Sequence, residues 1–236
     1  MLKTLIIMIS HQKSTNERKI LRHNDFIYHY FVGDETIESD YSLDVKTNTV
    51  RLRVADNYES LSEKVALAMK FAQEVYGEVI DGVFKTDDDI VIDLEILSKI
   101  IKENKQHKYF GIKNTVGESL SKYHFNKCES DEVNSTPQRV PACEYCSGGG
   151  YYVAKELLHH IFEQKPTTIF EDANVGKILN DFGVKPKHVA IKECAFWQSA
   201  VSLRMKNMFP HCECGLIVSS ELNFCPHCNR KYRNTK

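Results

Sequence analysis

The sequence predicts an α/β protein, and three observations support this class. Short β-branched apolar runs alternate with amphipathic stretches along most of the chain. Of the 236 residues, 42% are hydrophobic and 27% are charged, as in an ordinary globular protein. No run approaches the roughly 18 consecutive apolar residues of a membrane helix. We therefore expect a soluble chain with one sizeable core and a smaller appendage.

The first half of the chain predicts three strands before the first long helix. The strands are expected at 5–9, 27–32 and 49–54, and a helical stretch around 18–22 separates the first two. Ser60 and Glu63 form a capping box, so a helix should begin there. Its buried face is expected to consist of Leu61, Val65, Ala68, Ala72 and Val75, and Gly77 should end it.

A second strand and helix pair follows. Residues 79–84 predict a buried strand, and Asp93 is the expected N-cap of a helix that includes Leu94, Leu97, Ile100 and Ile101. Another strand is expected at 109–112. Residues 115–145 are polar and punctuated by Pro and Cys, which predicts loops with a short strand at 123–125.

The last part of this domain predicts two helices and a strand. Ala154, Leu157, Leu158 and Ile161 should face inward from the first helix. Val175, Ile178, Leu179 and Phe182 should face inward from the second, with Gly183 as its stop. A strand is expected at 188–196.

Three successive aspartates, Asp87, Asp88 and Asp89, come directly after the strand at 79–84. Ligands of open α/β sheets lie beyond the carboxyl ends of the strands. Carboxylate oxygens are also the ligands that Mg²⁺ and Mn²⁺ prefer, often together with a substrate phosphate. The residues alone equally allow a solvated turn or a helix cap.

Five sequence blocks in order resemble the β-1,3-galactosyltransferase and fringe-type glycosyltransferases. They are an Arg-x-x-Ile-Arg-like element at 18–22, the string DNYESLSEKV at 56–65, KTDDDIVIDLEIL at 85–97, YCSGGGYYVA at 145–154 and EDANVG at 171–176. The resemblance implies a GT-A fold, which is a Rossmann-like mixed sheet flanked by helices. It places a donor half at about 1–114 and an acceptor half at about 115–203.

The same resemblance implies an inverting, metal-dependent transferase that uses a UDP-linked sugar donor and a glycan or glycoprotein acceptor. The sugar would be of the galactose or N-acetylglucosamine type, transferred in β-1,3 linkage. Asp87 and Asp89 would bind Mn²⁺ or Mg²⁺, and Asp87 and Asp88 would contact the donor. The cation would neutralise charge on the departing diphosphate.

The resemblance also assigns the acceptor side of the site. Asp172 matches the catalytic base of the family, and a helix start should lower its pKa. Glu171 would bond the acceptor or cap the helix, and plain N-capping is the alternative for both acids. The acceptor would also border Ser147, Gly148, Gly149 and Gly150, a segment that is otherwise a turn with close backbone approach.

Three further residues are expected contacts. Lys64 and Arg22 would reach the diphosphate or the base, although either one is equally compatible with a solvated helix face. His188 would complete the metal shell, as a later histidine does in many family members; a surface or packed histidine is the alternative.

Residues 204–236 form a separate tail with six Lys or Arg against two Asp or Glu. Cys212, Cys214, Cys225 and Cys228 have the spacing of a structural zinc ribbon or knuckle, with disulfides or free thiols as the alternative. We expect the tail to close over the acceptor half, rather than dock a partner or touch nucleic acid. Cys143 and Cys146 are expected to be free thiols.

The cysteine pattern and the absence of a signal segment favour a reducing compartment, and we expect a cytoplasmic protein. Two other functions compete with sugar transfer. One is a metal-dependent nucleic-acid enzyme or binding module that uses the ribbon, and the other is a catalytically inactive sugar-binding relative. The net charge of −1 makes nucleic acid an unlikely partner.

Overall fold

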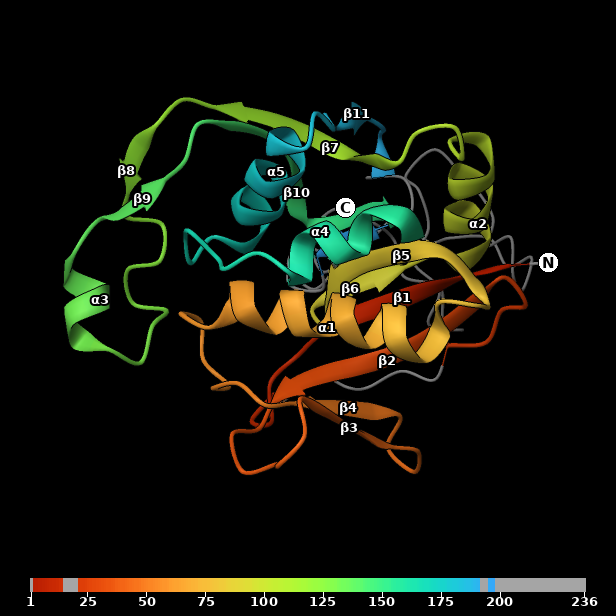
Figure 1. The fold of residues 1–236 in the computed structure, drawn as a ribbon, viewed down its shortest axis with the longest axis horizontal. Helices are drawn as coiled ribbons and strands as arrows, with labels where there is room; N and C mark the ends of the chain where they lie inside the picture. The colour runs from red at the N-terminus through yellow and green to blue at the C-terminus, as the bar shows by residue number, and fades with distance from the viewer. Residues whose placement is uncertain (1, 15–20, 192–194, 198–236) are drawn as a thin grey trace, which may run out of the picture.

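A computed structural model describes residues 2–14, 21–191 and 195–197 of the chain. The described residues form an eight-stranded mixed sheet with the order β11-β7-β10-β5-β1-β2-β4-β3 (Figure 1). Its strands are β1 (Lys3–Ile9), β2 (Phe26–Gly33), β3 (Tyr41–Asp44), β4 (Thr49–Leu52), β5 (Ile80–Asp87), β7 (Tyr109–Val116), β10 (Cys143–Ala154) and β11 (Lys187–His188). This architecture confirms the α/β class and fits the mixed sheet expected of a GT-A fold.

The helices cover the two faces of the sheet. They are α1 (Leu61–Tyr76), α2 (Leu94–Glu103), α4 (Leu158–Phe162) and α5 (Glu171–Asp181), with a 3₁₀ turn at Lys155–Leu157, while the short helix α3 (Asp131–Ser135) lies away from the sheet (Figure 1). Leu5 and Ile7 of β1 pack with residues of α1, α4 and α5, whereas Ile6 and Met8 pack with residues of α2. This alternation follows from the two-residue period of a strand that is buried on both faces.

The central strands of the sheet are parallel, and the side that contains β10, β7 and β11 is mixed. β1 pairs in parallel with β2 and β5, and β2 pairs in parallel with β4. β10 is antiparallel to both β5 and β7, while β11 is parallel to β7. A strand of the expected acceptor half, β10, therefore lies beside a strand of the expected donor half, β5.

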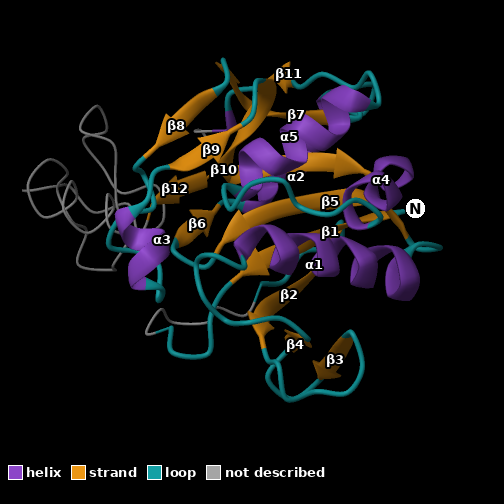
Figure 2. Ribbon diagram, turned by 60° about the vertical axis from the view of Figure 1, so that its left-hand side comes forward, coloured by secondary structure: helices purple, strands orange, loops and turns teal. Residues whose placement is uncertain are grey.

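Two small sheets lie outside the main one. β6 (Ile90–Ile92) pairs with β12 (Ala195–Trp197), and β8 (Ser119–Ser121) pairs with β9 (Gln138–Val140). Together with α3, β8 and β9 form an arm that projects beyond the main sheet (Figures 1 and 2). The arm occupies the segment expected to be loops, and the short strand expected at 123–125 is not formed.

Several local expectations were wrong. Ser60 precedes α1, but its side chain makes no capping hydrogen bond, and Asn57 instead accepts from the Ser60 N–H. Val75 and Phe182 are 44% and 48% exposed, so neither belongs to the buried face of its helix. The strand expected at 188–196 is divided into β11 and β12. By contrast, Asp93 caps α2 as predicted, because its carboxylate accepts from the Ile96 N–H.

Candidate active site

The three aspartates lie at the carboxyl edge of the parallel strands. Asp87 is the last residue of β5 and pairs in register with Ile9, the last residue of β1. Asp88 and Asp89 then form the turn into β6. Parallel strands end at one edge, so this turn occupies the place where open α/β sheets bind ligands.

Asp88 holds the loop that follows β1. Its N–H donates to the Ile9 carbonyl oxygen at 2.9 Å, and its Oδ2 accepts from the hydroxyls of Ser10 and Ser14, each at 2.6 Å. One contact to the end of β1 and two to the loop that follows it make Asp88 an organiser of the edge, and a role of its own in donor binding stays a prediction.

Asp89 carries a buried carboxylate oxygen, Oδ1, that has no hydrogen-bond partner among the described residues. Burial, together with the neighbouring charges of Asp87 and Asp88, raises the pKa of Asp89 to about 6. Asp87 is also accessible, with its side chain 29% exposed. An orphaned carboxylate oxygen beside two further carboxylates fits a divalent cation, which would supply the missing positive charge.

His188 is not brought to the aspartates. It lies on β11, and its row of the sheet runs through Gly111 and Tyr151 to Lys85, three strand spacings or about 14 Å away. Its Nδ1 accepts from the Lys113 N–H at 3.2 Å. Within the described ranges, no three His, Cys, Asp or Glu side chains gather as a metal site. A cation there would need oxygen ligands from substrate or water, as Mg²⁺ sites often do.

The glycine segment is part of a strand, and not the turn that was the alternative interpretation of its sequence. Between Cys146 and Tyr151, β10 advances five residues while its partner β7 advances only two, from Lys113 to Gly111. The three extra residues form a bulge whose peptide groups form hydrogen bonds with side chains. The Gly149 carbonyl, for example, accepts from the Thr86 hydroxyl at 3.0 Å. The bulge thus brings bare backbone against the end of β5.

Asp172 faces this glycine bulge from the first turn of α5. Its Oδ2 accepts from the Gly148 N–H at 3.1 Å, and its Oδ1 accepts from the Ala173 N–H at 2.8 Å. The side chain remains partly exposed. Burial raises the pKa of Asp172, while these N–H groups and the nearby Lys85 oppose the shift. The lowered pKa expected from a helix start was therefore wrong, because desolvation outweighs it.

Glu171 is buried, with 4% of its surface exposed. Its Oε1 accepts from the Lys85 ammonium at 2.5 Å and its Oε2 accepts from the Tyr151 hydroxyl at 2.9 Å. The N-cap residue of α5 is Phe170, so neither acid caps the helix. Both oxygens of Glu171 therefore have partners inside the protein, and a contact of Glu171 with the acceptor stays a prediction.

Lys64 and Arg22, the two expected basic contacts, do not lie on solvated helix faces. Lys64 is 2% exposed, and its ammonium donates to Asp56 Oδ1 at 2.6 Å and to the Ser10 carbonyl at 3.2 Å. Lys64 therefore fastens α1 to the end of β1. Arg22 is exposed on a non-helical segment four residues before β2, and thus leads into the amino end of that strand.

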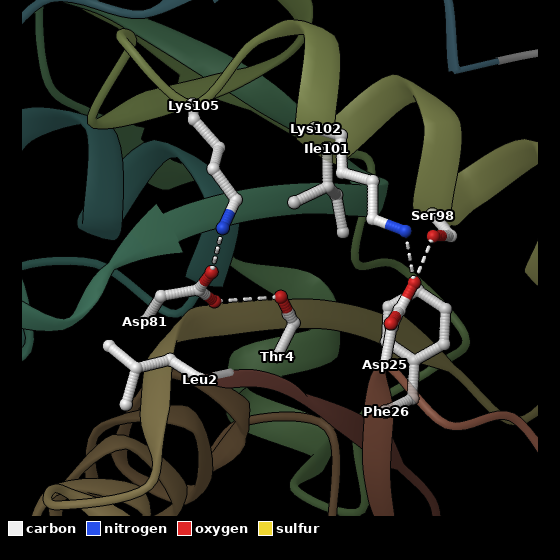
Figure 3. A pocket seen from close by; sticks show the side chains of 9 residues that line it. All are labelled: Leu2, Thr4, Asp25, Phe26, Asp81, Ser98, Ile101, Lys102 and Lys105. Carbon is white, nitrogen blue, oxygen red and sulfur yellow. Dashed lines mark hydrogen bonds and ion pairs between the residues drawn. The ribbon is translucent and has the colours of Figure 1, made fainter.

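A pocket at the opposite edge of the sheet does not belong to this site. It lies at the amino ends of β1 and β5, beneath α2 (Figure 3). Lys102 pairs with Asp25 at 2.6 Å and Lys105 with Asp81 at 2.8 Å. Asp81 also accepts from the Thr4 hydroxyl. These pairs satisfy the charged groups of the pocket and hold α2 against the strands.

The zinc prediction concerns Cys212, Cys214, Cys225 and Cys228, which lie outside the described residues. It stays a prediction that metal analysis of the purified chain can test. Cys143 and Cys146 are buried free thiols, as expected. No helix in the described ranges has the length and apolar character of a membrane span.

The mixed α/β sheet carries an acidic turn at its carboxyl edge, and Asp172 offers a partly exposed carboxylate beside the glycine bulge. This is the arrangement of a ligand-binding α/β enzyme. The Galactosyltransferase family model matches residues 8–190. The chain therefore belongs to the galactosyltransferase family, and this membership supports a glycosyltransferase with a sugar donor and an acceptor as its partners.

Two other comparisons add little. A search of curated proteins found no match to the chain. A solved structure titled "Crystal Structure of A197 from STIV" is 12% identical, with 80% of this chain and 82% of that chain covered and a TM-score of 0.38. A likeness this weak has no bearing on function.

Lys85 and Tyr151 are site residues that the sequence reasoning missed. Lys85 offered a signal, because it directly follows the apolar pair Val83 and Phe84, and a charged residue within a buried strand needs partners. Its partner Glu171 is 86 positions away in the chain, so the sequence alone does not reveal the pair.

Proposed function

We propose that this protein is an inverting, metal-dependent glycosyltransferase. It moves a hexose or N-acetylhexosamine from a UDP-sugar to a hydroxyl group of a glycan or glycoprotein acceptor. The observation that carries the proposal is Asp172, a partly exposed carboxylate of raised pKa that the Gly148 N–H orients near the strand bearing Asp87. Membership in the galactosyltransferase family supports the same reaction class.

Asp172 acts as the general base of a single displacement. It takes the proton of the acceptor hydroxyl while the hydroxyl oxygen bonds to the anomeric carbon of the donor. The bond from that carbon to the diphosphate oxygen breaks on the opposite face, so the configuration inverts and UDP leaves. The raised pKa makes Asp172 a stronger base than an ordinary aspartate, and its neighbour Glu171 is too buried for this role.

Asp87 and Asp89 would hold Mn²⁺ or Mg²⁺ on the donor side. The unpartnered Oδ1 of Asp89 and the accessible carboxylate of Asp87 support this assignment. A cation bound there would neutralise the charge that develops on the leaving diphosphate. Asp88 keeps the adjoining loop in place, and the β-1,3 linkage is proposed from the family resemblance alone.

A donor screen tests the proposal. The purified chain is incubated with Mn²⁺ and a panel of nucleotide sugars, and transfer to sugar acceptors and slow donor hydrolysis are recorded. We expect a response to a UDP-sugar that a chelator removes and added Mn²⁺ restores. Tight nucleic-acid binding without a response to any nucleotide sugar would contradict the proposal.

The role of the base is tested with Asp172→Asn. We expect kcat to fall by about 10² to 10⁴, the usual contribution of general base catalysis, while UDP binding in the presence of Mn²⁺ stays within about twofold. Asp181→Asn is the matched control, because Asp181 lies on the same helix but is exposed, and its carboxylate pairs with the neighbouring Lys177. Near-normal transfer by Asp172→Asn would show that another group takes the proton.

A further inference from the structure

Lys85 is a fully buried cation at the centre of the candidate site. It lies within β5 and has no exposed surface. Its ammonium donates to Asp87 Oδ1 at 2.8 Å, to Glu171 Oε1 at 2.5 Å and to the Gly148 carbonyl at 2.9 Å. These three acceptors belong to β5, α5 and β10, so one charged atom joins three elements.

Each of the three contacts leads to a group with a part in the proposed reaction. Asp87 is the accessible carboxylate on the donor side. Glu171 directly precedes Asp172 on the first turn of α5, so its position sets where that turn lies. Gly148 accepts from Lys85 through its carbonyl and donates its N–H to Asp172 Oδ2. The ammonium therefore touches the donor side directly and reaches the base through two independent routes.

Stability alone does not explain this arrangement. A buried ion pair is often replaced by apolar residues of similar volume without loss of stability, because desolvation offsets the attraction. One partner, Glu171, would suffice to neutralise the lysine. The additional contact to Asp87, whose side chain is 29% exposed at the edge of the sheet, ties the buried cation to the part of the site that faces solvent.

Lys85 is also not a proton donor or acceptor in the reaction. Although burial lowers its pKa, the charges of Asp87 and Glu171 raise it above its ordinary value. The ammonium therefore stays charged, and its full burial keeps it from touching the substrate.

We propose that Lys85 is a positioning residue, which fixes Asp87 on the donor side and Asp172 on the acceptor side relative to one another through a single buried ammonium. The inference rests on the proposed function and deepens it. Because a displacement of about 1 Å in a reacting group can lower a rate about 100-fold, such a link would set the rate of transfer as well as donor affinity.

The test uses a double substitution that removes the cation and neutralises its buried partner. Lys85→Met alone leaves the Glu171 charge unpaired and is expected to destabilise the fold. Lys85→Met/Glu171→Gln removes both charges, so its thermal midpoint should return close to that of Glu171→Gln. Lys85→Gln/Glu171→Gln serves in its place if the methionine variant does not fold, and Lys99→Met, an exposed lysine of α2, is the control for losing a lysine.

Three quantities are measured: the melting temperature, UDP binding by calorimetry with Mn²⁺, and kcat and KM for the donor. Relative to Glu171→Gln, we expect the double variant to show about tenfold weaker UDP binding and a kcat lower by about 10 to 100-fold, with the melting temperature preserved. Restored binding and kcat equal to those of Glu171→Gln would show that Lys85 only neutralises a buried charge, and would overturn the proposal.

Failure of the proposed function gives a different result. In that case the unsubstituted chain itself neither binds UDP nor transfers a sugar, and the role of Lys85 in transfer falls with it. If the unsubstituted chain binds and transfers while the double variant matches Glu171→Gln, only the inference about Lys85 fails.

Discussion

Burial separates the roles of the two neighbouring acids at the start of α5. Glu171 is enclosed and both its oxygens have protein partners, whereas Asp172 is partly exposed and held by backbone N–H groups. Glu171 therefore belongs to the framework of the site. Asp172 is the acid of the two that an acceptor hydroxyl can reach.

The raised pKa of Asp172 predicts a shifted acid limb in the pH profile of transfer. Asp172 must be ionised to accept a proton, so activity is lost as pH falls through its pKa in the folded protein. Because burial raises that pKa, we expect the half-maximal rate at a pH above the value of about 3.9 for an ordinary aspartate.

This shift is measured as kcat at saturating donor and Mn²⁺, with circular dichroism at each pH to confirm that the chain is folded. Asp181→Asn should leave the acid limb unchanged, since Asp181 is exposed. An acid limb at or below about pH 3.9 in the folded chain would contradict the assignment of Asp172 as a desolvated base.

At the scale of elements, α5 carries the base and must lie close to β10. Gly176 allows this approach, since a Cβ atom there would overlap the Tyr145 Cβ and lie 2.8 Å from the Glu144 carbonyl oxygen. Both neighbours belong to the strand, so a larger residue would push the helix and the strand apart. The position of Asp172 thus depends on a glycine four residues further along the helix.

We expect Gly176→Ala to lower both stability and transfer. Alanine within a helix is ordinarily favourable by up to about 1 kcal/mol, but overpacking costs about 1 to 3 kcal/mol, so the clash should decide the sign. Denaturant unfolding and kcat are the measurements. Gly117→Ala is the control, because no atom of the described residues lies within 4 Å of a Cβ at that position. Unchanged kcat and unfolding midpoint would show that α5 does not rely on this contact.

Elements with strong local patterns were predictable from the sequence. The Asp93 cap and the apolar residues of α2 are encoded within ten positions, and β1 contains a continuous apolar run at 5–9. β3 was missed because Tyr41–Asp44 is a half-buried edge strand without an apolar run. Gly148–Gly150 resembled a turn locally, and only pairing with distant strands makes this segment part of β10.

The same distinction applies to the candidate site. The acidic turn could be located from one strand and its end. The roles of Lys85 and Lys64 could not, because each ammonium also donates to a group that is distant in the chain, Glu171 for Lys85 and the Ser10 carbonyl for Lys64.

At the scale of the whole molecule, the expected donor and acceptor halves share one sheet. β10 lies between β5 and β7, and α1 packs against both α4 and α5. A chain cut after residue 114 would lose β10, α4 and α5. The edge of β5 and the apolar residues packed over it would then be open to water.

We therefore expect a fragment of residues 1–114 not to fold on its own. Far-ultraviolet circular dichroism on heating should show no cooperative transition, in contrast to the full chain, because a large part of the shared core is missing. A sharp thermal transition with native-like strand signal in the fragment would mean that the donor half is an independent folding unit.

The glycine bulge of β10 has a consequence for how the site can be altered. The group that orients Asp172 is the peptide N–H of Gly148, which no side-chain replacement elsewhere in the molecule can delete. Variants selected for new acceptors can therefore remodel the side chains around the base while its tether to the main chain is retained. Removing the tether itself requires a residue without an N–H at position 148, so proline is the one standard amino acid that would sever it.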